Sequence, residues 1–266
     1  LKSETLRLYN ESTTIDDATE ERSIAEGALV YNSSIIETDY TADAFNGSFP
    51  LQGFFAEKYV PLTNTTPDQL ARLVLDNDDK HTLRVGNSID LGNGYELTPQ
   101  QIDVDGEQVW MELTKDGEFV DDEVMDIADD ENVWTYEQDI LDEDDVPVLK
   151  VYVSNVFQGQ VDSLAVVEGL WMINPDDVRE IEDGDTFGNL EVDTIGDTKL
   201  TLTNDDSITL NRDDTATIAE NMNFRIADDS ALRYYPYVEM TIAGEEEPTE
   251  PEMPTAGFTA DPTSGE

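Results

Sequence analysis

The stretch LTKDGEFV, residues 113–120, nearly recurs as LTNDDSIT at residues 202–209. The flanking sequence extends the match, because DGEQVWMELTKDGEFV (105–120) and IGDTKLTLTNDDSITL (195–210) share one order of features. Each begins with a glycine turn, continues as an alternating strand and ends in an acidic turn. Alternation of apolar and polar residues with a period of two is typical of a half-buried β-strand. The fold therefore rests on a strand-turn-strand unit that the chain contains twice.

The core-facing positions of the two copies correspond, whereas the outer positions differ freely. A duplicated β-unit behaves in this way when only its buried residues are constrained. We therefore predict two tandem β-sandwich domains related by internal duplication. The alternative is two unrelated hairpins that share common turn chemistry. The inward pairs are Met111 with Leu200, Leu113 with Leu202, and Phe119 with Ile208, and the outward pairs are Trp110 with Lys199 and Glu112 with Thr201.

The rest of the chain also has strand patterning. VLKVYVSNVF (148–157) alternates Leu149, Val151 and Val153 against Lys150, Tyr152 and Ser154. ARLVLDNDDKHTLRVG (71–86) has the pattern of two strands around a polar turn, a hairpin. The chain is therefore predicted to be all-β. We place the first β-sandwich domain at residues 1–172 and the second at residues 173–243. Residues 244–266 are rich in Pro, Glu and Thr, which predicts an acidic linker leading toward a following module or an anchor.

The charge excludes several classes of partner. The 266 residues include 62 acidic and 14 basic side chains, giving a formal net charge of −48. Such a chain repels nucleic acids and anionic lipid surfaces, which carry dense negative charge themselves. It has no cysteine, so disulfides and thiolate chemistry are excluded. It has no apolar run of 18 residues, so this segment is expected not to insert into a membrane.

The residues do not assemble a catalytic set. A Ser–His–Asp triad would have to use His81, which lies beside a predicted turn, and no G-x-S-x-G motif is present. Pairs of carboxylates could serve glycoside hydrolysis, but 62 acidic residues make any one pair uninformative. We therefore predict a protein that is not an enzyme, with no catalytic residues and no cofactor.

Runs of acidic residues could hold hard cations. DNDD (76–79), DEDD (142–145), DGD (183–185) and the acid-rich segment 121–131 offer the oxygen ligands that calcium and magnesium prefer. None of them has the spacing of an EF-hand loop. We therefore assign no metal ligands and keep divalent cations as a candidate partner of solvated acidic turns.

Four N-glycosylation sequons lie in the first quarter of the chain, and none follows residue 67. Sequons of this kind mark surface loops in extracellular proteins. The glycosylation candidates are Asn10, Asn32, Asn46 and Asn64.

Several ordered segments make the chain resemble the surface-layer (S-layer) proteins of methanosarcinal archaea, over roughly residues 20–243. The final segment PTAGFTADPTSGE (254–266) is similar to the start of a PKD-type immunoglobulin-like module. The main resemblance is carried by GFFAEKYVP (53–61), HTLRVGNSIDLGNGYEL (81–97), VWMELTKDGEFV (109–120), DVPVLKVYVSNVF (145–157), SITLNRDDTATI (207–218) and LRYYPYVE (232–239).

The resemblance implies tandem β-sandwich domains, glycosylation, and a structural protein of the cell surface. Identical subunits of such a protein tile into a two-dimensional lattice, a protective coat and charged molecular sieve. The alternative is a surface adhesin or carbohydrate-binding module, in which Trp110, Trp134 and Trp171 would form stacking platforms. An exposed tryptophan row would favour that alternative, and buried tryptophans would favour a scaffold. A cytosolic enzyme of a halophile is a third hypothesis, disfavoured because no catalytic set can be assembled.

Overall fold

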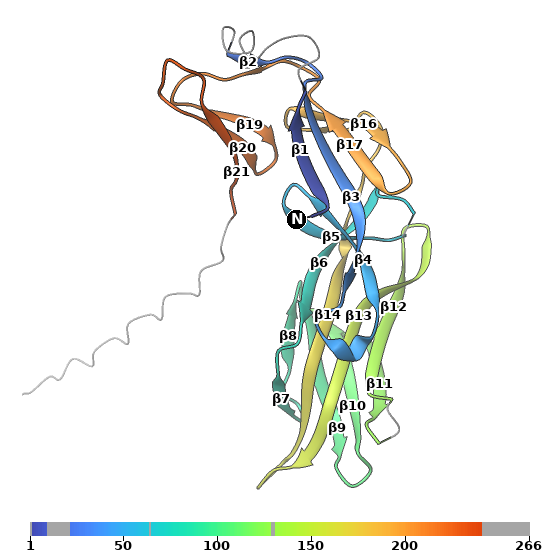
Figure 1. Cartoon of the computed structure of the whole chain (residues 1–266). Helices are drawn as coiled ribbons and strands as arrows, with labels where there is room; N and C mark the ends of the chain where they lie inside the picture. Colours follow the sequence, from blue (N-terminus) through green and yellow to red (C-terminus); the bar gives the residue numbers. More distant parts are fainter. Residues whose placement is uncertain (1, 10–21, 64, 129–130, 241–266) are drawn as a thin grey trace, which may run out of the picture.

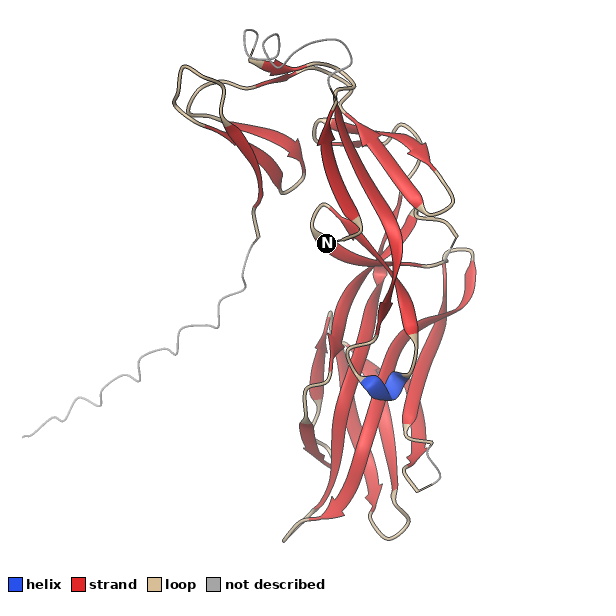
Figure 2. Ribbon diagram, in the orientation of Figure 1, coloured by secondary structure: helices blue, strands red, loops and turns tan. Residues whose placement is uncertain are grey.

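The computed structural model describes residues 2–9, 22–63, 65–128 and 131–240. In these residues the regular structure is β-strand, apart from one short 3-10 turn, η1 (Asp43–Phe45) (Figure 2). The prediction of an all-β protein is confirmed. The predicted linker at residues 244–266 and the sequons at Asn10 and Asn64 lie outside the described residues.

A 12-stranded antiparallel sheet runs along the length of the molecule (Figure 1). Ten of its strands follow one path, β1 joins it beside β3, and β7 joins it beside β14. In path order they are β12 (Val133–Ile140), β13 (Glu143–Gln158), β14 (Ser163–Glu180), β6 (Gln69–Asn77), β5 (Glu57–Pro61), β4 (Ser48–Phe54), β3 (Leu29–Asp39), β17 (Lys199–Thr203), β16 (Leu190–Ile195) and β15 (Thr186–Phe187), with β1 (Glu4–Leu8) and β7 (His81–Arg84) beside it.

Three smaller antiparallel sheets complete the fold. The four-stranded sheet covers the large sheet in the lower half of Figure 1, and the three-stranded sheet lies in the upper half. The four-stranded sheet has the order β11 (Glu118–Asp126), β10 (Gln108–Lys115), β9 (Tyr95–Asp103) and β8 (Ile89–Gly92). The others are β19 (Thr215–Ala219), β20 (Met222–Ile226) and β21 (Tyr234–Val238), and the pair β18 (Ile208–Thr209) and β2 (Ser23–Ile24).

Strand β14 is buried on both faces, which explains its nearly continuous apolar sequence. Leu170 and Met172 face one core, which they share with the four-stranded sheet. Trp171 and Ile173 face a separate core on the other side of the large sheet, where the Trp171 ring lies 5.5 Å from that of Phe49. The lower half of the molecule is therefore a β-sandwich with a second apolar layer behind it.

The core of the upper half joins residues that are far apart in sequence. Strand β17 pairs with β3, so that Leu202 lies opposite Tyr31. Both side chains pack in one cluster with Ile218 and Phe224 of the three-stranded sheet. Strands near the two ends of the described part of the chain therefore close the same core.

The predicted boundary between residues 172 and 173 falls inside β14, which is continuous from Ser163 to Glu180. The upper core also draws on both sides of that boundary, since Leu70 and Leu190 belong to it together. The structure places no break at this position. The division into 1–172 and 173–243 stays a prediction, and its test is given in the Discussion.

The inward positions of the repeated unit are confirmed except at its end. Met111, Leu113, Leu200 and Leu202 are fully buried. The expected match of Phe119 with Ile208 is wrong, because Phe119 is 61% exposed and Ile208 is 4% exposed. A register shift after Leu113 places Phe119 opposite the outward-facing Thr114, whereas β18 leaves the hairpin to pair with β2.

The hairpin predicted at residues 71–86 is also wrong, although both of its strands exist. β6 and β7 do not pair with each other; each pairs with β14, where Asn77 lies opposite Leu170 and His81 opposite Val167. With 18 residues, β14 is long enough to bind both strands end to end. The segment between β6 and β7 therefore does not form a hairpin turn. The two strands follow each other along the same strand, β14.

Candidate functional site

Of the sequons within the described residues, Asn46 is the exposed one. It follows η1 with φ +47, and its side-chain Nδ2 donates to the Ala44 carbonyl at 3.2 Å. Beside it lies an open hollow of about 480 Å³, whose lining includes Asp43, Asp78 and Glu168. A group attached at Asn46 would have free space and acidic neighbours.

Asn32 has a different environment. It lies in β3 between β1 and β17 and is half-buried. Its Oδ1 accepts a hydrogen bond from Thr201 Oγ1 at 3.0 Å, and its Nδ2 donates to Thr5 Oγ1 at 3.5 Å. The amide that a glycan would modify therefore already bridges two neighbouring strands.

The other candidates from the sequence do not come together as a chemical site. His81 begins β7 opposite Val167, and within the described part of the chain its imidazole makes no hydrogen bond or ion pair. Trp134 and Trp171 are buried, with 3% and 2% exposure, and Trp110 alone of the three lies at the surface. The indole N–H of Trp110 donates to Asp122 Oδ2 at 2.7 Å. No row of exposed tryptophans is formed.

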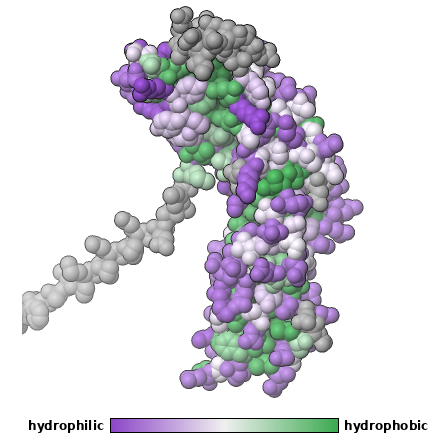
Figure 3. All heavy atoms as spheres, in the orientation of Figure 1, coloured by the Kyte–Doolittle hydropathy of each residue, from purple (hydrophilic) through white to green (hydrophobic). Residues whose placement is uncertain are grey.

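The acidic segments lie on the surface as separate turns and edges. Asp122 and Glu123 are exposed on β11, an edge strand of its sheet, and Asp142, Asp144 and Asp145 are exposed at the β12–β13 turn. Figure 3 shows hydrophilic residues over most of the visible face. Among the described residues no three histidine, aspartate or glutamate side chains converge as a cation cage. The described acidic residues are thus spread over the surface in separate segments.

One polar network, which the sequence did not indicate, fastens the β4–β5 turn. Phe55 and Ala56 have φ of +50 and +66, the left-handed region that a two-residue hairpin turn requires and that neither residue favours. Their N–H groups are bound by other strands: Phe55 donates to the Tyr31 hydroxyl at 2.9 Å, and Ala56 to Glu4 Oε1 at 2.8 Å. The Tyr31 hydroxyl donates to the same carboxylate at 2.6 Å. Burial, and then the Glu4 charge, raise the pKa of Tyr31.

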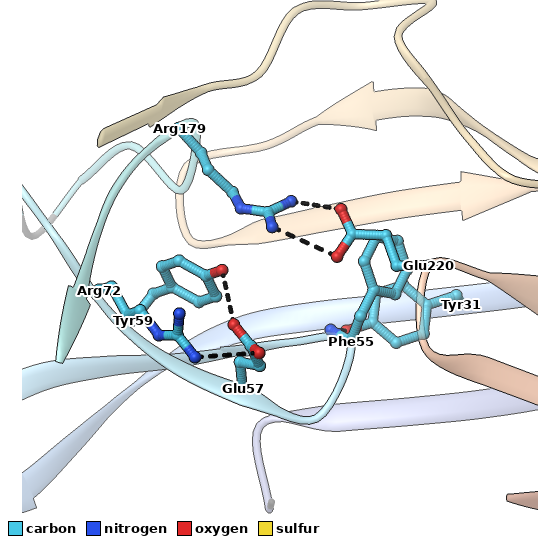
Figure 4. A network of polar contacts seen from close by, with 7 residues as sticks. All are labelled: Tyr31, Phe55, Glu57, Tyr59, Arg72, Arg179 and Glu220. Atoms are coloured by element: carbon cyan, nitrogen blue, oxygen red, sulfur yellow. Dashed lines mark hydrogen bonds and ion pairs between the residues drawn. The ribbon is translucent and has the colours of Figure 1, made fainter. Parts of the chain in front are cut away.

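The network continues to the three-stranded sheet through Arg179 and Glu220 (Figure 4). Arg179 donates from Nη1 and Nη2 to the two carboxylate oxygens at 2.5 and 3.2 Å. Its guanidinium lies 5.4 Å from the centre of the Tyr59 ring and 5.7 Å from that of Phe54. Burial raises the pKa of Tyr59 to about 12, despite the opposing effect of Arg179. This ion pair ties the β19–β20 turn to the end of β14.

These polar groups have a structural role in the fold. Tyr59 donates to Glu57, and Arg72 binds the same carboxylate at 3.1 Å, so acids, bases and aromatic rings from distant strands hold one another. A usable signal in the sequence was the scarcity of bases, since a few Arg residues among 62 acids are natural anchors. The acidic partner of each basic residue cannot be predicted without the order of the strands. In the described residues no helix is long and apolar enough to cross a membrane.

Comparison with known proteins gives one consistent relationship. A sequence model of the family described as S-layer protein matches residues 1–228. The chain is 50% identical over 248 residues to a major S-layer protein of Methanosarcina acetivorans, which covers 89% of this chain and 37% of that protein. It is 46% identical over 242 residues to a major S-layer protein of Methanosarcina mazei, covering 88% and 36%.

A third relative agrees with these two. The chain is 48% identical over 229 residues to a major S-layer protein of Methanosarcina barkeri, covering 84% of this chain and 34% of that protein. The chain therefore spans about a third of the length of the curated relatives it matches.

Proposed function

Since the chain belongs to the S-layer protein family, we propose that it is a structural subunit of an archaeal surface layer outside the cell. Copies of the subunit tile into a two-dimensional lattice that serves as a protective coat. The observation that carries this proposal is the family match, which covers nearly the whole described fold. The rigid, antiparallel β architecture suits a lattice unit, because every strand is fixed by its neighbours.

The charge gives the coat its sieving property. With a net charge of −48 and exposed carboxylates on β11 and the β12–β13 turn, pores between subunits would pass cations and neutral solutes and repel anions. A non-catalytic role is supported by the isolated position of His81 and by the structural use of the buried polar groups.

The alternative of a carbohydrate-binding surface is weaker. Trp134 and Trp171 pack inside the cores, which favours a scaffold over a row of stacking platforms. Trp110 alone remains for a sugar ring, with its indole N–H already engaged by Asp122.

Self-association in divalent salt tests the lattice proposal. Monovalent salt only screens repulsion within a Debye length of about 8 Å at physiological ionic strength. Calcium or magnesium can bridge carboxylates of two copies at coordination distance. We expect either divalent ion to promote association more strongly than potassium chloride at matched ionic strength, measured by light scattering, with ordered sheets visible by electron microscopy. Equal responses would mean simple screening, and a chain that stays monomeric in every salt would contradict the lattice.

Glycosylation is proposed at Asn46 and not at Asn32. The first amide is exposed at a turn, and the second lies between two paired strands. In protein made in a glycosylating archaeal host, Asn46→Gln is expected to remove one glycan, and Asn32→Gln none. Both asparagines lie in one tryptic peptide, residues 23–58, so fragmentation of that glycopeptide by mass spectrometry assigns the site. A glycan found on Asn32, with Asn46 unmodified, would contradict the assignment.

A further inference from the structure

The end of the β13–β14 hairpin is nearly free of charge. Between Lys150 and Glu168 the sequence contains a single charged residue, Asp162. Arg84 pairs with Asp162 at 3.6 Å, and Lys80 pairs with Glu168. In a chain with 62 acids and 14 bases, two of the bases thus neutralise this one hairpin. Its end carries almost no net charge.

The same hairpin end exposes apolar side chains. Val161 is 86% exposed, Val85 at the end of β7 is 52% exposed, and Phe157 is 38% exposed. These positions share one end of the sheet, since Phe157 lies opposite Leu164, Leu164 lies opposite Arg84, and Val85 follows Arg84. Alternation along the strands puts Phe157 and Arg84 on one face and the neighbours of Arg84 on the other, so the exposed side chains surround the end of the hairpin on both faces. We name Val85, Phe157 and Val161 the tip patch.

The turn that presents the tip patch is closed by backbone hydrogen bonding. Gly159 donates its N–H to the Asp162 carbonyl at 2.8 Å, and the next residues of the hairpin, Gln158 and Ser163, are paired. A Cβ at Gly159 would lie 2.9 Å from that carbonyl oxygen, so the turn is tight. Val161 therefore lies within a turn that is closed by a hydrogen bond between Gly159 and Asp162.

The tip patch lies at the lower end of the molecule, where the β13–β14 turn projects beyond the other strands of the large sheet (Figure 1). The first and last described residues lie in other parts of the molecule (Figure 1). The neighbouring β9–β10 turn carries Asp103, Asp105 and Glu107, which confines the neutral surface to the hairpin. Hydrophobic residues are visible among hydrophilic ones at this end in Figure 3.

We propose that the tip patch is a contact surface for a second copy of this chain. Two copies with a charge of −48 each repel wherever acidic surfaces face each other, and they can approach closely where charge is absent and apolar area can be buried. The tip patch satisfies both conditions. This inference rests on the proposed lattice, and it locates one of the contacts that do not need a bridging cation.

A charge placed on the tip patch tests the inference. Val161→Asp adds one negative charge at the tip, and Phe119→Asp adds the same charge at the 61% exposed Phe119 on acidic β11. Sedimentation equilibrium in calcium chloride measures association of each variant and of the wild type. Val161→Asp is expected to weaken association by about tenfold or more, equivalent to about 1.4 kcal/mol, and Phe119→Asp by less than about twofold. A second variant, Val161→Asn, removes the apolar contact without adding charge and is expected to weaken association by a smaller factor.

The outcomes separate this inference from the lattice itself. Wild-type association with an undiminished Val161→Asp variant would overturn the tip contact and leave the lattice standing. Equal weakening by both aspartates would also overturn it, since the effect would then be general repulsion. A wild-type chain that stays monomeric would overturn both proposals. Circular dichroism shows whether each variant keeps the wild-type fold, which the exposed positions should allow.

Discussion

Leu202→Ala is expected to lower the free energy of unfolding by about 2–5 kcal/mol, the range for leucine deletion in a packed core. Leu202 is fully buried in β17, between Val192 of β16 and Tyr31 of β3. The cavity would open in the core that the first and last strands close together. Leu141→Ala is the matched control: Leu141 is 48% exposed, and the same deletion there should cost less than about 1 kcal/mol. Urea unfolding followed by far-ultraviolet circular dichroism, which reports on the strands of both halves, measures both.

The same experiment tests the division of the chain into domains. Leu113→Ala makes the equivalent deletion in the lower core, where Leu113 packs with β13 and β14. Because β14 runs through the lower sandwich and then reaches the upper half, where Ile181 joins the upper core, we expect one cooperative transition that either substitution shifts. Two transitions, each shifted by one variant only, would instead establish two independent units.

The sequence correctly predicted which side chains of a strand are buried, because this depends only on residues close together in the chain. The alternation in 148–157 was correct in β13, where Leu149, Val151 and Val153 are buried. The inward positions around Leu113 and Leu202 were correct for the same reason, since period-two patterning is a local consequence of burying one face of a strand.

Strand partners could not be predicted from such patterns. β17 pairs with β3, about 170 residues earlier, and β6 and β7 share β14. Such partners depend on contacts between residues that are far apart in the sequence, and local patterning does not record them. The exposure of Phe119 follows from a register shift that no composition signals. Among the candidate site residues, the sequons and acidic runs were readable as motifs, but their accessibility was not: Asn32 and Asn46 look alike in sequence and differ in the fold.

The ion pair of Arg179 and Glu220 shows the same limit, since the two residues are 41 positions apart and meet only because β19–β20 folds back on the β4–β5 hairpin. Their side chains are 29% and 35% exposed, between a surface pair and a fully buried one. The pair makes two hydrogen bonds, and the guanidinium also lies against two aromatic rings. These contacts fix the orientation of the guanidinium and strengthen the ion pair. This ion pair should therefore contribute more to the free energy of unfolding than a surface ion pair does.

A double-mutant cycle measures the coupling free energy between Arg179 and Glu220. Arg179→Ala and Glu220→Ala are each expected to lower the free energy of unfolding by about 1–3 kcal/mol, with a coupling energy of about 1–2 kcal/mol. Arg225 and Asp213 provide the matched control, an Arg–Asp pair 40% and 67% exposed whose coupling should stay below about 1 kcal/mol. The larger coupling should also fall less in molar potassium chloride than that of the control, because the rings of Tyr59 and Phe54 cover part of the Arg179 guanidinium. A coupling no larger than that of the control, lost in salt, would mean that apolar contacts alone hold the three-stranded sheet in place.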